Sequence, residues 1–281
     1  MTAVTAEPRA AARPMRGPWL RFALYVARRK RLAPLAWGLP LGLMAVMIVA
    51  VFPSIQSSSQ LDELIKAYPD ALKEAFGITD ASFSSISGYL AAEIFSMIAP
   101  FTAAGFMIHA MATGISGAER RGVLDVMLSA PARRRHMLAG ELAGAAGVLL
   151  VITLVLGLLT QVAAYAFGVD LPLADTLAGA VNLWPLGVFF GGVTVLLAGL
   201  TRRSAVVGGG AAGVLTLMYL MEVLGKLSDA FATVDDLSAF HYYGSAIEDG
   251  LDPGACAILV AAGAVVTAVG CALFERRDVG A

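Results

Sequence analysis

Apolar residues in this chain gather into six long runs, and polar residues are largely confined to the segments between them. An α-helix rises about 1.5 Å per residue, so about 20 apolar residues cross the roughly 30 Å hydrocarbon core of a bilayer. The runs are too long and too continuously apolar for the strands of a membrane barrel. They therefore predict an all-α membrane protein with six spans, at about residues 32–52, 89–115, 142–167, 177–200, 205–224 and 255–274.

Composition and charge strengthen this interpretation. The chain is 58% hydrophobic and 15% charged, whereas soluble domains carry about 25% charged residues. Seventeen of the 20 lysines and arginines fall on one side of the predicted membrane, and only Lys66, Lys73 and Lys226 fall on the other. The positive-inside rule places both termini in the cytoplasm. Most carboxylates lie on the opposite side, so a net charge of −1 hides a dipolar molecule and excludes nucleic-acid binding.

The chain divides into an N-terminal arm and one membrane domain. Residues 1–18 are rich in Ala, Arg and Pro and are expected to be a disordered cytoplasmic arm, and residues 19–281 form the domain. Residues 19–31 have helical amphipathic spacing and predict a short helix lying in the cytoplasmic interface. The alternative is a plain positive-inside signal. The apolar face consists of Trp19, Phe22, Ala23 and Val26.

Two outer connections carry patterns of their own. The connection between the first two runs has an apolar stripe at helical spacing and predicts an amphipathic helix on the outer surface. Residues 226–253 predict a shorter one, in which Phe240, Tyr242 and Tyr243 anchor the outer interface. Contact with a ligand is the alternative for these aromatics.

Three ionisable residues lie inside predicted spans. Glu93 and Glu222 lie at a similar depth toward the outer leaflet, and His109 lies deeper. Ionisable groups within a membrane are functional candidates, so these three residues are assigned to a possible translocation path. The alternatives are interfacial positions or pairing with Ser96 or Tyr219 for the acids, and a structural hydrogen bond for His109.

Other chemistry is not supported. Glycines in the fourth and fifth runs favour close helix packing, with a flexible helix as the alternative. Cys256 and Cys271 are about 22 Å apart along one helix, too far for a disulfide. We find no phosphate-binding loop, catalytic triad or metal cluster in the sequence. The chain is therefore expected to be non-catalytic, without a metal or cofactor of its own.

The exception to the apolar pattern is the polar segment of residues 119–135, between the second and third runs. Its five arginines and two carboxylates exclude it from the bilayer. Leu124, Met127 and Leu128 nevertheless keep helical spacing within it, and Pro131 interrupts the pattern. Such a stripe predicts a helix that docks into a partner; a loop that only fixes topology is the alternative.

This segment resembles the cytoplasmic segment of the type-2 ABC exporter permeases, whose usual form is Glu-x-x-Gly-Thr-Leu-Glu/Asp, a Leu-Leu pair and Pro-x-x-Arg. The order of elements along nearly the whole chain is similar too. Val123 replaces the usual Thr, and Glu141 stands where these permeases more often carry Lys. The resemblance implies a coupling helix that docks on an ATPase through Glu119, Gly122, Leu124, Asp125, Met127, Leu128, Pro131 and Arg134.

The resemblance further implies an exporter subunit in a bacterial plasma membrane. Two copies of a cytosolic ATPase subunit would bind ATP and Mg²⁺, and a second permease copy or a paralogue would complete the path. Drugs, antibiotics, lipids and polysaccharides are substrates across the family. Two other functions remain open on the residues alone: a secondary transporter coupled to protons or cations through Glu93 or Glu222, and a non-transporting membrane component that recruits an ATPase.

Overall fold

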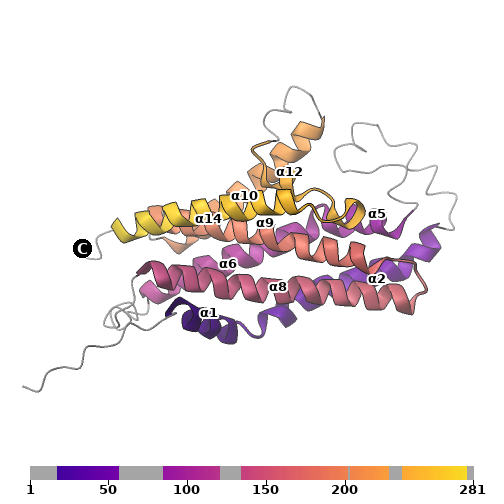
Figure 1. Cartoon of the computed structure of the whole chain (residues 1–281), viewed down its shortest axis with the longest axis horizontal. Coiled ribbons are helices and arrows are strands. Elements are labelled where there is room, and N and C mark those ends of the chain that lie inside the picture. Colours follow the sequence, from indigo (N-terminus) through magenta and orange to yellow (C-terminus); the bar gives the residue numbers. More distant parts are fainter. Residues whose placement is uncertain (1–17, 57–84, 121–133, 202, 228–235, 277–281) are drawn as a thin grey trace, which may run out of the picture.

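The computed structural model describes residues 18–56, 85–120, 134–201, 203–227 and 236–276, and within these ranges every regular element is a helix (Figure 1). Five helices are long and apolar enough to span a membrane, and a bent pair makes a sixth. The prediction of an all-α protein with about six apolar helices is therefore confirmed. The five are α2 (Leu39–Gln56, preceded by the π-helix η1, Pro34–Gly38), α8 (Arg134–Ala166), α9 (Leu173–Leu200), α10 (Ser204–Leu227) and α14 (Pro253–Arg276).

The second span differs from the straight helix expected over residues 89–115. It consists of α5 (Ile86–Leu90), the π-helix η2 (Ala91–Phe95) and α6 (Ile98–Arg120), and it bends by 40°. The Ser96 amide donates to the carbonyl of Ala91 at 2.8 Å, five residues back, which widens the turn. A π-turn inside a helix is a recognised cause of a kink. Apolar periodicity carries no signal for such an insertion.

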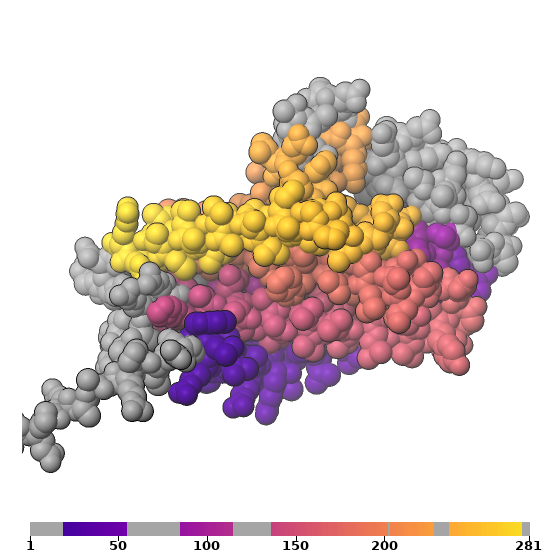
Figure 2. Space-filling view, viewed as in Figure 1, coloured from indigo at the N-terminus to yellow at the C-terminus, as the bar shows by residue number. Residues whose placement is uncertain are grey.

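Helix α9 lies at the centre of the bundle. Of its most apolar 18 residues 72% are buried, against 17% in α10 and 22% in α14. Helices α6, α8, α10 and α14 all pack on it, and α14 lies across one face of the molecule in the view of Figure 2. The side chains of α9 therefore form the core, whereas much of α10 and α14 faces outward.

Glycines set the distance between α9 and α14. A Cβ atom on Gly192 would lie 2.6 Å from the carbonyl oxygen of Gly263, and one on Gly199 would lie 2.8 Å from that of Gly270. Both helices place these glycines seven residues apart, so the two pairs fall on the same faces two turns apart. Close approach through small residues is a common way for membrane helices to associate. The expected packing role of Gly192 and Gly199 agrees with this geometry.

The predicted amphipathic helix near the N-terminus forms as α1 (Pro18–Arg29), and it packs against the beginning of α8. Ala23 and Val26 are buried in this contact, whereas Trp19 is exposed. Gly140 and Gly144 of α8 provide the seat, because Cβ atoms there would lie 2.9 Å and 2.6 Å from backbone oxygens of α1.

A buried carboxylate fixes α1 on this seat. Glu141 is 4% exposed. Its Oε1 accepts a hydrogen bond from Nη2 of Arg29 at 2.7 Å and lies 3.7 Å from Nζ of Lys30. Burial lowers the pKa of Lys30, and the Glu141 carboxylate partly opposes that shift. Lys30 also donates to the carbonyl of Ala110 in α6 at 3.4 Å. One cluster of charges therefore joins α1, α6 and α8.

Three of the predicted elements lie almost wholly outside the described residues: the N-terminal arm, apart from Pro18, the amphipathic helix between the first two spans, and the docking helix within residues 119–135. Short helices do form after α10, namely α12 (Ala239–Tyr243) and α13 (Ala246–Asp249).

The glycine pairs generate a stability prediction. Replacing Gly270 with Ala brings a Cβ atom within 2.7 Å of the Leu196 backbone, so we expect the free energy of unfolding to fall by about 1–3 kcal/mol through overpacking. Gly147 is the matched control, because a Cβ atom there meets nothing within 4 Å. Gly147→Ala should be neutral or stabilising, since Ala is more favourable than Gly inside a helix by about 1 kcal/mol. Thermal unfolding of the purified protein in detergent measures both; equal shifts for the two variants would contradict the packing role.

The charge cluster generates a second prediction. Glu141→Arg places three cations together at a buried position, and we expect a loss of stability of about 1–3 kcal/mol, moderated by the partial exposure of Arg29. The paired exchange Glu141→Arg with Arg29→Glu restores opposite charges and should recover most of the loss. Thermal unfolding of the two single variants and the double variant forms the cycle. Additive losses in the double variant would show that the pair does not couple α1 to α8.

Candidate functional site

The predicted docking segment lies between two described helices, at the end of the bundle that the charge pattern assigns to the cytoplasm, with α6 ending at Arg120 and α8 beginning at Arg134. Glu119 belongs to α6 and Arg134 to α8. The other six residues assigned to docking, Gly122, Leu124, Asp125, Met127, Leu128 and Pro131, lie outside the described residues.

The two flanking helices are in contact where they approach this segment. A Cβ atom on Gly114 of α6 would overlap the carboxylate of Glu141 in α8. Glu141 is the position that departs from the usual Lys of the exporter permeases. The structure shows where its charge is used: it pairs with Arg29 and Lys30 of the N-terminal segment. Helix α1 is thereby attached to the first turns of α8, the helix that follows the predicted docking segment.

The three residues assigned to a translocation path occupy separate environments. Glu93 is exposed within η2, and His109 is exposed on α6 with its ring 6.2 Å from that of Trp37. Glu222 is 8% exposed near the end of α10. Of the three, only Glu222 lines the cavity described next.

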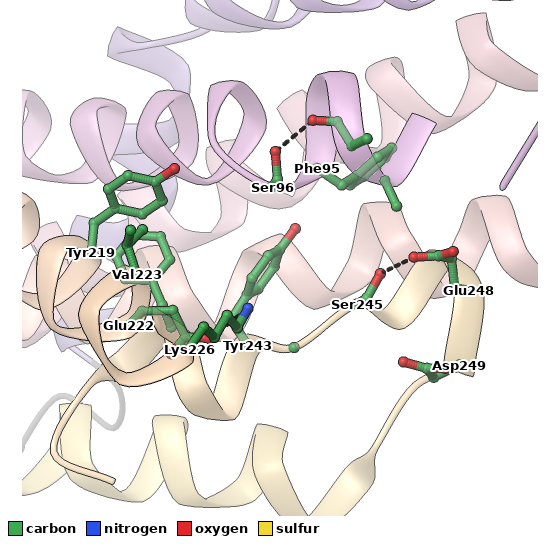
Figure 3. Close-up of a pocket in the computed structure, with 14 residues that line it drawn as sticks. Phe95, Ser96, Tyr219, Glu222, Val223, Lys226, Tyr243, Ser245, Glu248 and Asp249 are labelled. Atoms are coloured by element: carbon green, nitrogen blue, oxygen red, sulfur yellow. Dashed lines mark hydrogen bonds and ion pairs between the residues drawn. The ribbon is translucent and has the colours of Figure 1, made fainter. Parts of the chain in front are cut away.

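A cavity of about 290 Å³ opens at the end of the bundle that the charge pattern assigns to the outside. Figure 3 shows three groups of residues around it: Phe95 and Ser96 from η2 and its C-terminal end, Tyr219, Glu222 and Lys226 from α10, and Ser245, Glu248 and Asp249 from the region of α13. The π-turn of η2 contributes to the wall, so the bend of the second span and the cavity occur at the same place.

Aromatic rings form much of the wall of this cavity. Phe95, Tyr219, Phe240 and Tyr243 all line it. Tyr219 and Phe240 pack edge to face with their centroids 5.3 Å apart. Phe240 and Tyr243 are buried, so they turn into the bundle rather than forming the outer aromatic belt expected from the sequence, and burial raises the pKa of Tyr243. These rings turn inward because α12 packs against α9, α10 and α14.

Hydrogen bonds position α12. The amide of Asn182 in α9 donates to the carbonyl of Tyr243 at 2.6 Å. The hydroxyl of Ser238 donates to the carbonyl of Met218 in α10 at 2.8 Å and accepts from the amide of Phe240 at 3.0 Å. Side chains that satisfy buried backbone groups in this way are costly to lose. The aromatic wall is therefore rigidly attached to both α9 and α10.

The cavity lining carries more negative than positive charge. Glu222, Glu248 and Asp249 contribute carboxylates, and Lys226 contributes an ammonium group. Nζ of Lys226 lies 2.9 Å from Oε1 of Glu222, one helical turn away. The hydroxyl of Ser245 donates to Oε2 of Glu248 at 3.0 Å. Of these residues, the sequence predicts only Glu222 as part of a translocation path. It also predicts the aromatic run around Phe240, but it contains no pattern that indicates the return of this run toward Glu222.

A second hollow has a different character. It is an apolar groove of about 690 Å³ between α8, α9 and α14, lined mainly by small residues, with Trp184 and Val188 from α9. The indole nitrogen of Trp184 donates to the carbonyl of Ala146 at 2.9 Å, which uses the one polar group of that side chain. The outer cavity is thus the better candidate for selective binding, because it combines apolar walls with a few placed charges.

Comparison with known proteins identifies a family. A family model described as the C-terminal domain of the multidrug efflux system permease Rv1217c matches residues 21–275, nearly the whole chain. A search of curated proteins found no match. The family agrees with the apolar helices and with the resemblance to exporter permeases seen in the sequence. This chain is a multi-pass membrane protein that belongs to the multidrug efflux permease family of the Rv1217c C-terminal domain.

Proposed function

We propose that this chain is the membrane subunit of an ATP-driven multidrug exporter in a bacterial plasma membrane. The family match over residues 21–275 is the observation that carries the proposal. The chain itself is non-catalytic and binds no cofactor, and ATP and Mg²⁺ are bound by two copies of a separate cytosolic ATPase. Both termini face the cytoplasm.

The ATPase docks on the segment between α6 and α8. A helix there would present Leu124, Met127 and Leu128 to an apolar groove, which is a common mode of helix recognition. Charged residues at its ends, including Glu119 and Arg134, would pair at the rim. The contact of Glu141 with Gly114 supports this role, because it joins the two helices that would receive the movement of the ATPase.

A second permease copy, or a paralogue, packs on α10. Only 17% of the most apolar part of α10 is buried. Gly209 and Gly213 lie four residues apart with open space beside each, and Leu217 and Leu220 continue the same exposed face. Small residues at this spacing favour close packing of membrane helices.

Docking is tested with matched substitutions in the segment. Leu124→Asp and Leu128→Asp each place a charge in the apolar contact, and Val126→Asp places the same charge on the opposite face of the helix. We expect the two leucine variants to retain less than a tenth of the co-purified ATPase, a loss of about 1.4 kcal/mol or more. Val126→Asp should retain most of it. The assay requires a cytosolic ATPase with a phosphate-binding loop from the same organism, and a neighbouring gene that encodes one would be the first candidate.

Efflux from cells expressing both subunits gives the functional readout. Drug accumulation should rise in the leucine variants and stay near wild type in Val126→Asp. Undiminished ATPase capture and efflux in Leu124→Asp would refute docking through this segment. Efflux that collapses with an uncoupler while ATP remains plentiful would instead support a secondary transporter. A complex that assembles but transports no drug would indicate a non-transporting component.

A further inference from the structure

We propose that the outer cavity binds organic cations that carry an aromatic ring system, and that such cations are the substrate class this permease releases. The inference rests on the proposed function for the transport step, but the binding step stands on the cavity itself. Three features of the lining carry it: its charge, the position of Lys226 and its aromatic walls.

The charge of the lining selects a cation. Among the residues that the structure describes, three carboxylates and one ammonium group line the cavity, a formal excess of two negative charges. Glu222 lies near the end of a predicted membrane span and is 8% exposed. A carboxylate in such a low-dielectric position is stabilised strongly by a nearby positive charge. An anionic ligand would face repulsion from the same groups.

Lys226 already places a cation at this position. Its ammonium group lies 2.9 Å from the Glu222 carboxylate, yet its side chain is 45% exposed. It belongs to the last turn of α10 and is attached by a flexible stem. The ammonium group is therefore able to turn into solvent when another cation reaches Glu222. Lys226 acts as a competitor for the ligand, and this role distinguishes the cavity from a simple structural ion pair.

The aromatic walls select the rest of the ligand. Tyr219 packs edge to face against two other rings, with its centroid 5.1 Å from that of Phe101 and 5.3 Å from that of Phe240, and these two rings also contact each other. Aromatic faces and edges attract organic cations and flat ring systems. A cavity of about 290 Å³ is at the small end of ligand sites and suits one or two fused rings. A hydrated metal ion would gain no favourable contact with these aromatic rings.

Equilibrium binding tests the inference without nucleotide or transport. The full chain is purified into nanodiscs of zwitterionic phosphatidylcholine, so that lipid charge does not attract the probe. Calorimetric titration compares N-methylquinolinium with quinoline, a neutral molecule of similar shape at neutral pH. We expect saturable binding of the cation and at least tenfold weaker binding of quinoline.

Three variants separate this site from general attraction. Glu222→Gln keeps the shape of the side chain and should weaken cation binding at least tenfold. Lys226→Gln removes the competing ammonium group and should strengthen binding severalfold. Glu93→Gln is the matched control, because Glu93 is an exposed carboxylate of the adjoining η2 that does not line the cavity, and it should change the affinity less than twofold.

The outcomes are distinct. Equal affinity in wild type and Glu222→Gln, or weaker binding in Lys226→Gln, would overturn the inference. Equal weakening in Glu93→Gln and Glu222→Gln would assign the effect to surface charge and overturn it as well. If Glu222→Gln did not fold, the sign of the Lys226→Gln effect would decide. The titration uses no ATPase, so a failure of ATPase docking would leave the binding result unaffected. A failure of cation binding would equally leave the result of the docking assay unaffected.

Discussion

A buried carboxylate near the N-terminal end of α8 determines how the N-terminal part of this protein is arranged. Glu141 is almost fully buried and begins the apolar part of its helix. An ionised carboxylate is stable there only when cations and hydrogen-bond donors surround it. Arg29 and Lys30 supply both, so α1 must lie on α8, and the glycines beside Glu141 let its backbone approach. The position of the first span follows, since η1 and α2 continue the chain from α1.

The same physical requirement shapes the outer end in another way. Glu222 is also buried, but its cation comes from its own helix, one turn away. That pair lies within a single helix. Its surroundings instead form an open cavity with aromatic walls. The two buried carboxylates therefore differ in role: Glu141 pairs across helices, whereas Glu222 pairs with a half-exposed lysine of its own helix and is the carboxylate that we propose binds a ligand.

The features that could be predicted from the sequence are those with a regular period or a large composition bias. The apolar runs located the spans, and the spacing around Val26 located α1. The partner of Glu141 could not be predicted, because a pair 112 residues apart leaves no local pattern. The π-turn at η2 could not be predicted either, since one additional residue in a helical turn does not interrupt an apolar run. The cavity could not be predicted either, because it forms from the π-turn at η2 and the return of α12 toward α10.

Helix α6 links the two ends of the molecule. It has 23 residues, which corresponds to about 35 Å, and it runs from the proposed docking segment to the π-turn that forms part of the cavity wall. Helical hydrogen bonds make it stiff along its axis, whereas the π-turn is a point where a helix bends readily. A movement of α6 along its axis, applied at Arg120, would therefore be transmitted almost fully to Phe95 and would change the angle of the bend at η2. The chain places its bend at the cavity, where a change of shape would alter ligand binding.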